Sequence, residues 1–446
     1  MASRSPEKVA FVASLIVLAF LYGFVVRAWD WFPNELLVQA GDQAQAVYAF
    51  SPPSFVTSRV YDWQGVREEQ PDKMQPGLTL VTSEWEGPEG YLPEVRLMDR
   101  DGKTAHRWRV DPRELFPDSL DDRRIGRRNI HGSHLLPNGD VLVNFGQVGT
   151  VRLGACSDAQ WRLPVRSHHS IERAEDGSFW VSGSSQEPRR TSPGHPNGLP
   201  GLMKPVYHEP LLNVSEDGKV LDSLNVLDVL YANGLERHIA EAFQPHANKD
   251  GLQTTDLTHV NDVEPLRASL ADEYPLFDEG DLMVSIRNLS LVFVVDPETR
   301  RVKWHADDPF ILQHDPDFLG NGWIGIFDNA SDFTDRGAML GRSRIVAIQP
   351  HTDSVEVRFP TKHSDPFHTG SMGKWQQLAN GNMLLTESKA GRVVEVTPEG
   401  RTVWEWVHAP YDENHVPEVT EATRYDLTPE EVASWSCSSS DMSSSR

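Results

Sequence analysis

The chain has 446 residues, a formal net charge of −23, an aromatic content of 9% and 13 tryptophans. Its length exceeds that of one ordinary hydrophobic core, so a closed repetitive fold is one way to use it in a single domain. The acidic charge argues against nucleic acid and an anionic membrane surface as partners, although local histidines and arginines can still form a pocket for a small anion.

The N-terminal stretch combines a short polar start with an apolar run. Residues 1–8 are polar and are expected to form a cytoplasmic tail. Val9–Val26 is apolar, is just long enough to cross a bilayer as a helix, and is not followed by a small-x-small cleavage site. The sequence therefore predicts a transmembrane signal anchor over 9–27, a stalk over 28–77, and a folded domain on the periplasmic or extracytoplasmic side of the inner (cell) membrane.

A repeat centred on a tight turn runs from about residue 78 to about residue 408. In its first half, a histidine lies about seven residues before an Asn-Gly or Asp-Gly turn, and an apolar strand follows the turn. These dipeptides are strong hairpin signals because Asn, Asp and Gly tolerate positive φ. The copies are His131 with Asn138-Gly139, His169 with Asp176-Gly177, His259 with Glu279-Gly280 after an insertion, His314 with Asn321-Gly322, and Gly373 in place of histidine with Asn380-Gly381.

A second half-repeat follows each of these copies. Its clearest examples are Val292–Trp304 and Val393–Trp406, which read as strand, turn and strand with apolar residues at every second position. Four strands in a unit of about 40 residues are typical of a propeller blade. Counting about six units, the sequence predicts an all-β fold, a six-bladed β-propeller over 78–408, with short helical insertions. A pair of β-sandwiches and a β-solenoid are the alternative architectures.

Two insertions and a C-terminal segment fall outside the repeat. The insertions, 184–209 and 227–256, are equally compatible with substrate lids and with surface decoration. Residues 409–446 are predicted to form a Pro-rich return, a short helix that begins with Thr428 as its N-cap, and a disordered Ser-rich tail.

The chain has two cysteines, Cys156 and Cys437. A disulfide between them is possible, but it is not the state that the sequence favours. Neither a Cys-x-x-Cys pair nor a zinc-type spacing is present.

The strongest functional signal is the register of four histidines, His131, His169, His259 and His314, which precede the inner strands of successive units. Inner strands line the central channel of a propeller, so these side chains should converge at one channel mouth. Arg287, expected on the inner strand of the His259 unit, should point to the same region. A single histidine in a loop is usually structural, but four in register predict a shared functional site.

Several imidazoles together with a guanidinium favour an anion whose charge grows in the transition state. A neutral imidazole is also a competent nucleophile near pH 7, so phosphoryl or sulfuryl transfer fits both demands. Zinc or copper binding is a rival interpretation, although Arg287 would repel a dication. Calcium is a second metal variant, and its ligands would be Asn261, Asp262, Asp315, Asp328 and Asn329. These residues are better explained as turn caps and supports for the histidines, so no metal or cofactor is expected.

The motifs resemble the bacterial arylsulfotransferase (aryl-sulfate sulfotransferase) family. The resemblance covers roughly residues 78–408 and is most specific over 256–330. The motifs that carry it are His168-His169, His259-Val-Asn261-Asp262, Val284-Ser-Ile-Arg287-Asn288, Gln313-His314-Asp-Pro-Asp-Phe-Leu, Ile326-Phe327-Asp328-Asn329 and Thr386-Glu387-Ser388.

The resemblance implies an enzyme that moves a sulfuryl group from a phenolic sulfate ester to a phenol, without a nucleotide sulfate donor. It implies that His314 is the nucleophile and forms a sulfohistidine. His259 and Arg287 would hold sulfuryl oxygens and offset the charge of the leaving phenolate, and His169 would do the same or shuttle the proton. The residues assigned to substrate binding are His131, His168, Asn261, Asn329 and His368.

Two alternatives to the sulfotransferase stay open. One is a metal-dependent propeller hydrolase, and the other is a non-catalytic propeller that acts as a binding scaffold. A homodimer is also left open by the sequence.

Overall fold

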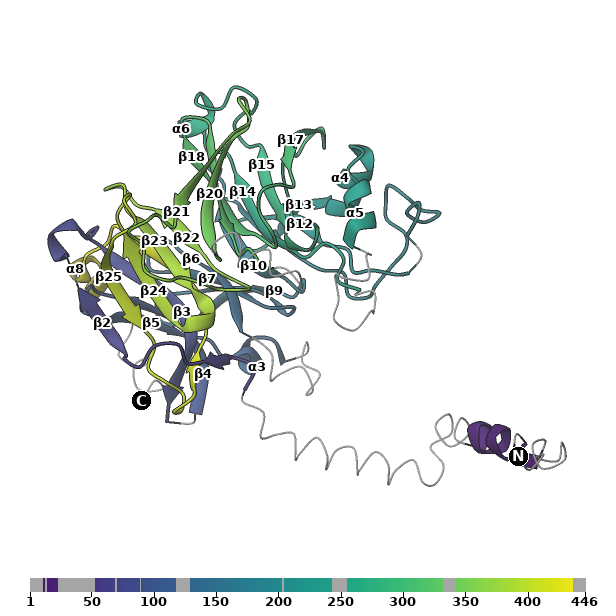
Figure 1. The fold of residues 1–446 in the computed structure, drawn as a ribbon, viewed down its shortest axis with the longest axis horizontal. Helices are drawn as coiled ribbons and strands as arrows, with labels where there is room; N and C mark the ends of the chain where they lie inside the picture. Colours follow the sequence, from purple (N-terminus) through teal and green to yellow (C-terminus); the bar gives the residue numbers. More distant parts are fainter. Residues whose placement is uncertain are drawn as a thin grey trace, which may run out of the picture. The chain divides into compact units, whose positions relative to one another are not determined.

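The computed structural model describes residues 11–12, 14–22, 53–68, 70–88, 90–117, 129–202, 204–242, 255–331 and 342–435 (Figure 1). The chain divides into two units, Met1–Ser54 and Phe55–Arg446. In the first unit, residues 11–12 and 14–22 are helical. The predicted tail over 1–8, the rest of the span 9–27 and most of the predicted stalk lie outside the described residues. Within the described segments, no helix combines the length and the apolar character needed to cross a membrane.

The second unit is a six-bladed β-propeller, as predicted, built from antiparallel sheets of four or five strands in the described part of the chain. From the innermost strand outward, blade 1 contains β27 (Val419–Tyr425), β3 (Leu78–Gly87), β4 (Gly90–Met98) and β5 (Thr104–Arg109), and blade 2 contains β6 (Ile130–Leu135), β7 (Val141–Phe145), β8 (Gly149–Leu153) and β9 (Ala159–Leu163). Blade 3 contains β10 (His168–Arg173), β11 (Phe179–Ser182), β12 (Pro210–Val214) and β13 (Val220–Asn225), and blade 4 contains β14 (Val260–Pro265), β15 (Leu282–Ile286), β16 (Leu291–Val295) and β17 (Val302–Ala306). Blade 5 contains β18 (His314–Gly320), β19 (Trp323–Asp328), β20 (Arg344–Gln349) and β21 (Ser354–Phe359), and blade 6 contains β22 (Trp375–Gln377), β23 (Met383–Glu387), β24 (Arg392–Val396) and β25 (Thr402–Val407), with β2 (Gly65–Glu68) as its fifth strand.

The six innermost strands close into a ring. Each contacts the next in the order β27, β6, β10, β14, β18 and β22, and β22 contacts β27 again. The apolar core lies between neighbouring blades, where strand faces pack on each other. Between blades 3 and 4, for example, Trp180 and Leu211 belong to one buried cluster with Val284 and Phe293. The ring therefore leaves its central channel to polar side chains.

The propeller extends beyond the predicted range 78–408 at both its N-terminal and its C-terminal end. The segment 409–446 was expected to hold only a return, a helix and a tail, but β27 is the innermost strand of blade 1 and pairs with β3 from Val419 to Tyr425. Blade 1 is thus closed by strands from both ends of the chain, which removes two exposed sheet edges. The predicted stalk over 28–77 also ends on the propeller, because β1 (Val56–Ser58) pairs with β26 (His415–Pro417) and β2 pairs with β25.

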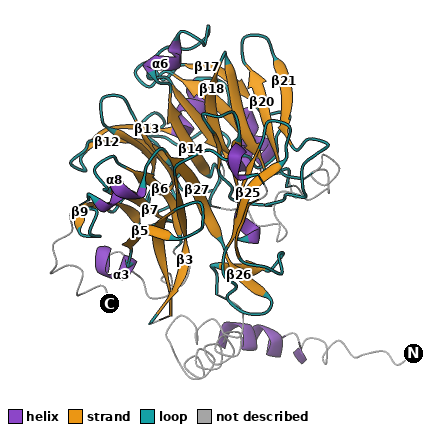
Figure 2. Ribbon diagram, turned by 90° about the vertical axis from the view of Figure 1, so that its left-hand side faces the viewer, coloured by secondary structure: helices purple, strands orange, loops and turns teal. Residues whose placement is uncertain are grey.

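Helices are few and short beside the strands (Figure 2). They are α3 (Pro112–Leu115), α4 (Val226–Ala232), α5 (Arg237–Ala242), α6 (Ala268–Ala271), α8 (Pro429–Ala433), and the 3-10 turns η1 (Pro71–Lys73), η4 (Arg287–Leu289) and η5 (Ser388–Ala390). The predicted start of α8 is confirmed, since Thr428 and Glu431 form a capping box. The two insertions contact each other, because Asp228 of α4 accepts hydrogen bonds from Ser192 and from the backbone N–H of Gly194.

Cys156 is disulfide-bonded, contrary to the favoured prediction. The chain's other cysteine, Cys437, lies outside the described residues. Among the described residues, those near Cys156 lie close to the end of α8. The ring of His106 lies 5.4 Å from that of Trp435 between centroids, and its Nε2 lies 2.7 Å from the carbonyl oxygen of Ala155. The sequence could not show this, because it depends on how α8 docks.

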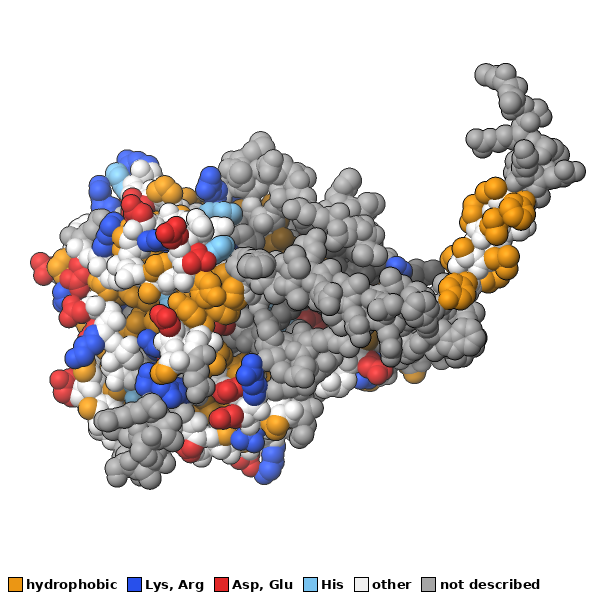
Figure 3. All heavy atoms as spheres, turned by 90° about the horizontal axis from the view of Figure 1, so that it is seen from below, with side chains coloured by type: hydrophobic (Ala, Val, Ile, Leu, Met, Phe, Trp, Pro, Cys, Tyr) orange, Lys and Arg blue, Asp and Glu red, His pale blue; other side chains and the backbone are white. Residues whose placement is uncertain are grey.

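The negative net charge is not gathered in one place on the face seen in Figure 3. Acidic and basic side chains alternate there over the described residues. Over the described residues, the face in Figure 3 therefore carries no concentration of charged side chains of one sign.

Candidate active site

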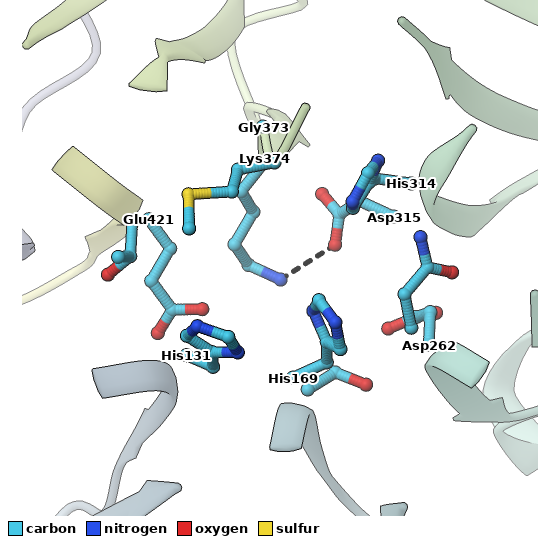
Figure 4. Close-up of a pocket in the computed structure, with 12 residues that line it drawn as sticks. His131, His169, Asp262, His314, Asp315, Gly373, Lys374 and Glu421 are labelled. Carbon is cyan, nitrogen blue, oxygen red and sulfur yellow. Dashed lines mark hydrogen bonds and ion pairs between the residues drawn. The ribbon is translucent and has the colours of Figure 1, made fainter. Parts of the chain in front are cut away.

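Four histidines from four blades meet at one end of the channel. His131 belongs to β6, His169 to β10 and His314 to β18, while His259 directly precedes β14. Ring centroids are 5.1 Å apart for His131 and His169, 5.1 Å for His169 and His259, and 6.0 Å for His169 and His314. The predicted convergence is therefore present, and we refer to these four residues as the histidine layer, of which Figure 4 shows His131, His169 and His314.

Irregular backbone at the start of each inner strand aims these side chains. The pairing register shifts in the first residues of β6, β10, β14 and β18. His169 and His259 have φ values of 60° and 52°, and in β18 the left-handed residue is Asp315, at 45°. Such a conformation in a residue other than glycine costs about 1 kcal/mol or more, and bulges of this kind re-aim side chains at functional sites. Gly132 is required for the close approach of β10, because a Cβ there would lie 1.9 Å from the carbonyl oxygen of His169.

His314 is held as a neutral imidazole with one free nitrogen. Its Nδ1 lies 2.6 Å from Asn329 Oδ1. Asn329 donates both amide hydrogens, to the carbonyl oxygens of Thr369 at 2.8 Å and Met372 at 2.6 Å, so its oxygen must face the imidazole. Nδ1 of His314 therefore carries the hydrogen. Nε2 is buried and has no hydrogen-bond partner among the described residues. Burial, with a contribution from the charge of Arg287, lowers the pKa of His314 to about 3.

His259 has a different partner, a carboxylate. Its Nδ1 lies 2.6 Å from Asp256 Oδ2, and its Nε2 lies 3.1 Å from Nε2 of His169. Burial alone would raise the pKa of Asp256, but the charge of His259 and the hydrogen bond between them lower it to about 2. Burial lowers the pKa of His169 well below its ordinary value, and the neighbouring histidines add to this effect. The arrangement is a line of three groups, Asp256, His259 and His169.

Asp256 was not singled out from the sequence. It lies at the end of the predicted insertion 227–256, outside the repeat, so no alignment of blades draws attention to it. The available signal was its position three residues before His259, a spacing at which a side chain in a loop can reach the imidazole.

Arg287 lies close to the histidine layer, but not where predicted. It belongs to η4, after β15, and therefore follows the second strand of blade 4 rather than lying on the inner strand. Its backbone N–H donates to the carbonyl oxygen of His259 at 3.1 Å. Its guanidinium donates to Asn288 Oδ1 at 3.0 and 3.2 Å, and Asn288 donates to the carbonyl oxygen of Asp256 at 2.9 Å. Burial lowers the pKa of Arg287, but the guanidinium of an arginine stays protonated in proteins, so its positive charge is kept.

Of the remaining residues predicted for the site, some line the cavity and others do not. His131 lines the cavity with a buried Nδ1 that has no partner among the described residues, and burial lowers its pKa to about 3. Asn261 also lines the cavity and donates to the carbonyl oxygen of Gln313 at 2.7 Å. His168 does not line it; its Nε2 lies 3.0 Å from Glu209 Oε1. His368 is exposed and lies outside the lining, with its Nδ1 3.2 Å from Ser343 Oγ.

A second set of charged residues continues along the inner strands, and we refer to Asp262, Asp315, Lys374 and Glu421 as the carboxylate layer. Lys374 Nζ lies 2.8 Å from Asp315 Oδ1, and the pair faces the same cavity as the histidines (Figure 4). Burial raises the pKa of Glu421 to about 7 and, together with Asp315, raises that of Asp262 well above its usual range. Lys374 follows Gly373, the copy without a histidine, so the sequence signal was the break in the repeat itself.

Three of the five residues of the calcium variant have other partners for their side-chain oxygens. Asp315 pairs with Lys374, and Asp328 pairs with Arg344 at 2.7 Å. Asn329 is engaged by His314. In the described segments, no group of three or more His, Cys, Asp and Glu side chains has an arrangement that could hold a metal ion.

The family model described as arylsulfotransferase (ASST) matches residues 132–409, more than half of the chain. No curated protein matches the sequence. Among solved structures, a protein of unknown function from Bacteroides caccae is 12% identical, with a TM-score of 0.49, and the match covers 78% of this chain and 98% of that chain. A catalytically inactive virginiamycin B lyase from Staphylococcus aureus is 10% identical, with a TM-score of 0.38, covering 77% of this chain and 88% of that chain. Likenesses at these scores carry no functional inference.

Proposed function

Because the chain belongs to the arylsulfotransferase (ASST) family, we propose that it transfers a sulfuryl group from a phenolic sulfate ester to a phenol through a sulfohistidine on His314. The observation that carries this proposal is the free, buried Nε2 of His314, opposite an Nδ1 whose hydrogen is held by Asn329. A neutral imidazole with its lone pair facing a cavity is a competent nucleophile. A nucleotide sulfate donor is not needed, since the ester itself supplies the sulfuryl group.

In the first half-reaction, His314 Nε2 attacks sulfur as the bond between sulfur and the aryl oxygen breaks. The leaving phenolate takes a proton and departs as a phenol. Arg287 and the histidine layer offset the negative charge that grows on the sulfuryl and phenolate oxygens.

The sulfohistidine keeps its hydrogen on Nδ1, because Asn329 can accept a hydrogen bond but cannot accept the proton. The imidazole therefore stays cationic and is a good leaving group. In the second half-reaction the acceptor phenol loses its proton as its oxygen attacks sulfur, and the electron pair of the broken N–S bond returns to Nε2.

The proposal is tested by the intact mass of the chain from residue 53 onward after brief mixing with p-nitrophenyl sulfate. We expect a gain of one sulfuryl group, roughly 80 Da, which is absent in His314→Ala and is discharged by added phenol. His368→Ala is a matched control, since His368 is an exposed histidine outside the cavity lining. No adduct and no released nitrophenol, with or without phenol, would overturn the proposal.

The same experiment, repeated in the presence of a metal chelator, separates the two alternatives. A metal-dependent hydrolase would lose activity on chelation, whereas transfer through His314 would not. A scaffold would show neither adduct nor turnover. The anchor over 9–27 and the extracytoplasmic location remain predictions from the sequence, which cell fractionation would test. The sequence leaves a homodimer open, and the mass of the purified protein in solution would decide it.

A further inference from the structure

The transfer of a sulfuryl group between two phenols also requires the transfer of a proton. The first phenol leaves with one proton more than its ester supplied, and the second phenol gives one proton up. A group beside the reacting oxygens must therefore release a proton and later recover it. His314 is unsuited to this task, because its Nδ1 hydrogen is held by an amide and its Nε2 is used for attack on sulfur.

The histidine layer contains a second imidazole with the opposite kind of partner. Nδ1 of His259 faces the carboxylate of Asp256 at 2.6 Å, whereas Nδ1 of His314 faces the amide oxygen of Asn329 at the same distance. A carboxylate stabilises the protonated imidazole beside it, and an amide does not. The two histidines are thus differentiated by one atom of the partner side chain, with one suited to nucleophilic attack and the other to holding a proton.

The position of His169 connects this second histidine to the cavity. Nε2 of His259 lies 3.1 Å from Nε2 of His169, and His169 itself lines the cavity beside His314. Among the described residues, Arg287 and His168 also face Asp256. Arg287 is committed to Asn288, and His168 to Glu209, so neither interrupts the line.

We propose that Asp256 is a positioning residue that fixes the hydrogen of His259 on Nδ1, so that the pair of His259 and His169 gives a proton to the leaving phenolate and later recovers one from the acceptor phenol. This inference rests on the proposed function. In the first half-reaction the pair gives one proton to the leaving oxygen, and the imidazolium becomes neutral. In the second half-reaction the pair takes one proton from the acceptor hydroxyl, so the protons balance over one turnover.

The test is Asp256→Asn, measured as the rate of adduct formation with two donors. An asparagine can donate to Nδ1 of His259, which reverses the tautomer and removes the charge. Phenyl sulfate has a weakly acidic leaving phenol that needs the proton, and we expect its rate to fall about 10²- to 10⁴-fold. p-Nitrophenyl sulfate has a far better leaving group, and we expect its rate to fall less than about tenfold.

Asp412→Asn is the matched control, because Asp412 Oδ1 lies 2.8 Å from Nδ1 of His415 at the same spacing of three residues, and neither residue lines the cavity. We expect it to leave the ratio of the two rates as in the unmodified protein. His169→Gln is the second test of the line if Asp256→Asn does not fold, and it should change the ratio in the same direction.

The outcomes distinguish the two proposals. Equal losses with both donors, in Asp256→Asn or in His169→Gln, would overturn the role of Asp256 and leave the sulfohistidine intact. If the unmodified protein formed no adduct with phenyl sulfate and none with p-nitrophenyl sulfate, the proposed function would instead be overturned.

Discussion

The histidine layer and the carboxylate layer line one channel and share only the inner strands of blades 4 and 5, yet their polar atoms differ greatly in their hydrogen-bond partners. In the histidine layer, Nε2 of His314 and Nδ1 of His131 are buried without partners among the described residues. In the carboxylate layer, Asp315 pairs with Lys374 and accepts from the backbone N–H of Trp375 at 2.7 Å, while Glu421 accepts from Ser133. Buried polar groups are normally hydrogen-bonded, so the unpartnered atoms indicate that the histidine layer is the part of the channel available to bind a ligand.

The difference teaches how one ring of strands can hold both an active site and its support. Unpartnered groups destabilise the fold and are kept where chemistry needs them. Partnered groups fix the ring of strands that carries the histidines, from positions next to His314 on β18 and at the neighbouring strands β22 and β27. We therefore expect substitutions in the histidine layer and its holders to change mainly activity, and substitutions in the carboxylate layer to change mainly stability.

The largest expected effect is that of Asn329→Ala on adduct formation. The amide fixes the tautomer of His314, and loss of a tautomer-fixing partner lowers rates by up to about 10⁴-fold in a comparable arrangement. We expect a loss of about 10³-fold in the rate measured by rapid quenching and intact mass. The carbonyl oxygen of Met372 also loses its donor, at about 1–3 kcal/mol, whereas that of Thr369 keeps the hydroxyl of Ser343 as a donor. A rate within tenfold of the unmodified protein would show that Asn329 does not control His314.

The sequence predicts those features of the channel that depend on local sequence pattern, namely the blades and the histidine layer. Turns at Asn138-Gly139 and its equivalents mark each blade, and the register of His131, His169, His259 and His314 is sufficient to bring them together. These features repeat because each blade is the same supersecondary unit.

What the sequence did not show depends on tertiary arrangement. Glu421 lies on β27, which closes blade 1 only because the two ends of the propeller meet. Asp256 lies at the end of an insertion. Lys374 is one position after Gly373, which stands where the repeat would have a histidine. Arg287 lies in η4 instead of on the inner strand. Bulges and closures of this kind change which residue faces the channel without changing the hydrophobic pattern, so periodicity cannot detect them.

The second expected effect is on stability. Lys374→Met removes the positive charge from a buried pair and leaves Asp315 beside Asp262 and Glu421. Breaking such a pair by removing one partner destabilises proteins by about 3–5 kcal/mol. Urea denaturation should show this loss, and the double variant Lys374→Met with Asp315→Asn should recover most of it. If the single variant were as stable as the unmodified protein, the pair would not be the support that we infer.

The smallest expected effect is a difference in how the two layers respond to pH. The pKa values of His131 and His314 are lowered to about 3 in the folded state, below about 6.5 for an unfolded histidine. The unfolded chain therefore binds more protons between these values, and the stability that these groups contribute is lost as pH falls below about 6.5. The pKa of Glu421 is raised to about 7, so the folded chain binds more protons there, and stability is lost as pH rises from about 4.5 to 7.

The two layers thus act in opposite directions across the same range, and single substitutions can separate them. Each group contributes about 1 kcal/mol per pH unit within its window. In urea denaturation between pH 5 and pH 7, the slope of the free energy of unfolding against pH should be more positive in Glu421→Gln than in the unmodified protein. In His131→Asn this slope should be less positive than in the unmodified protein. Parallel curves for both variants would mean that neither group changes its proton binding on folding. The division of the channel into an unpartnered layer and a satisfied layer would then have no thermodynamic counterpart.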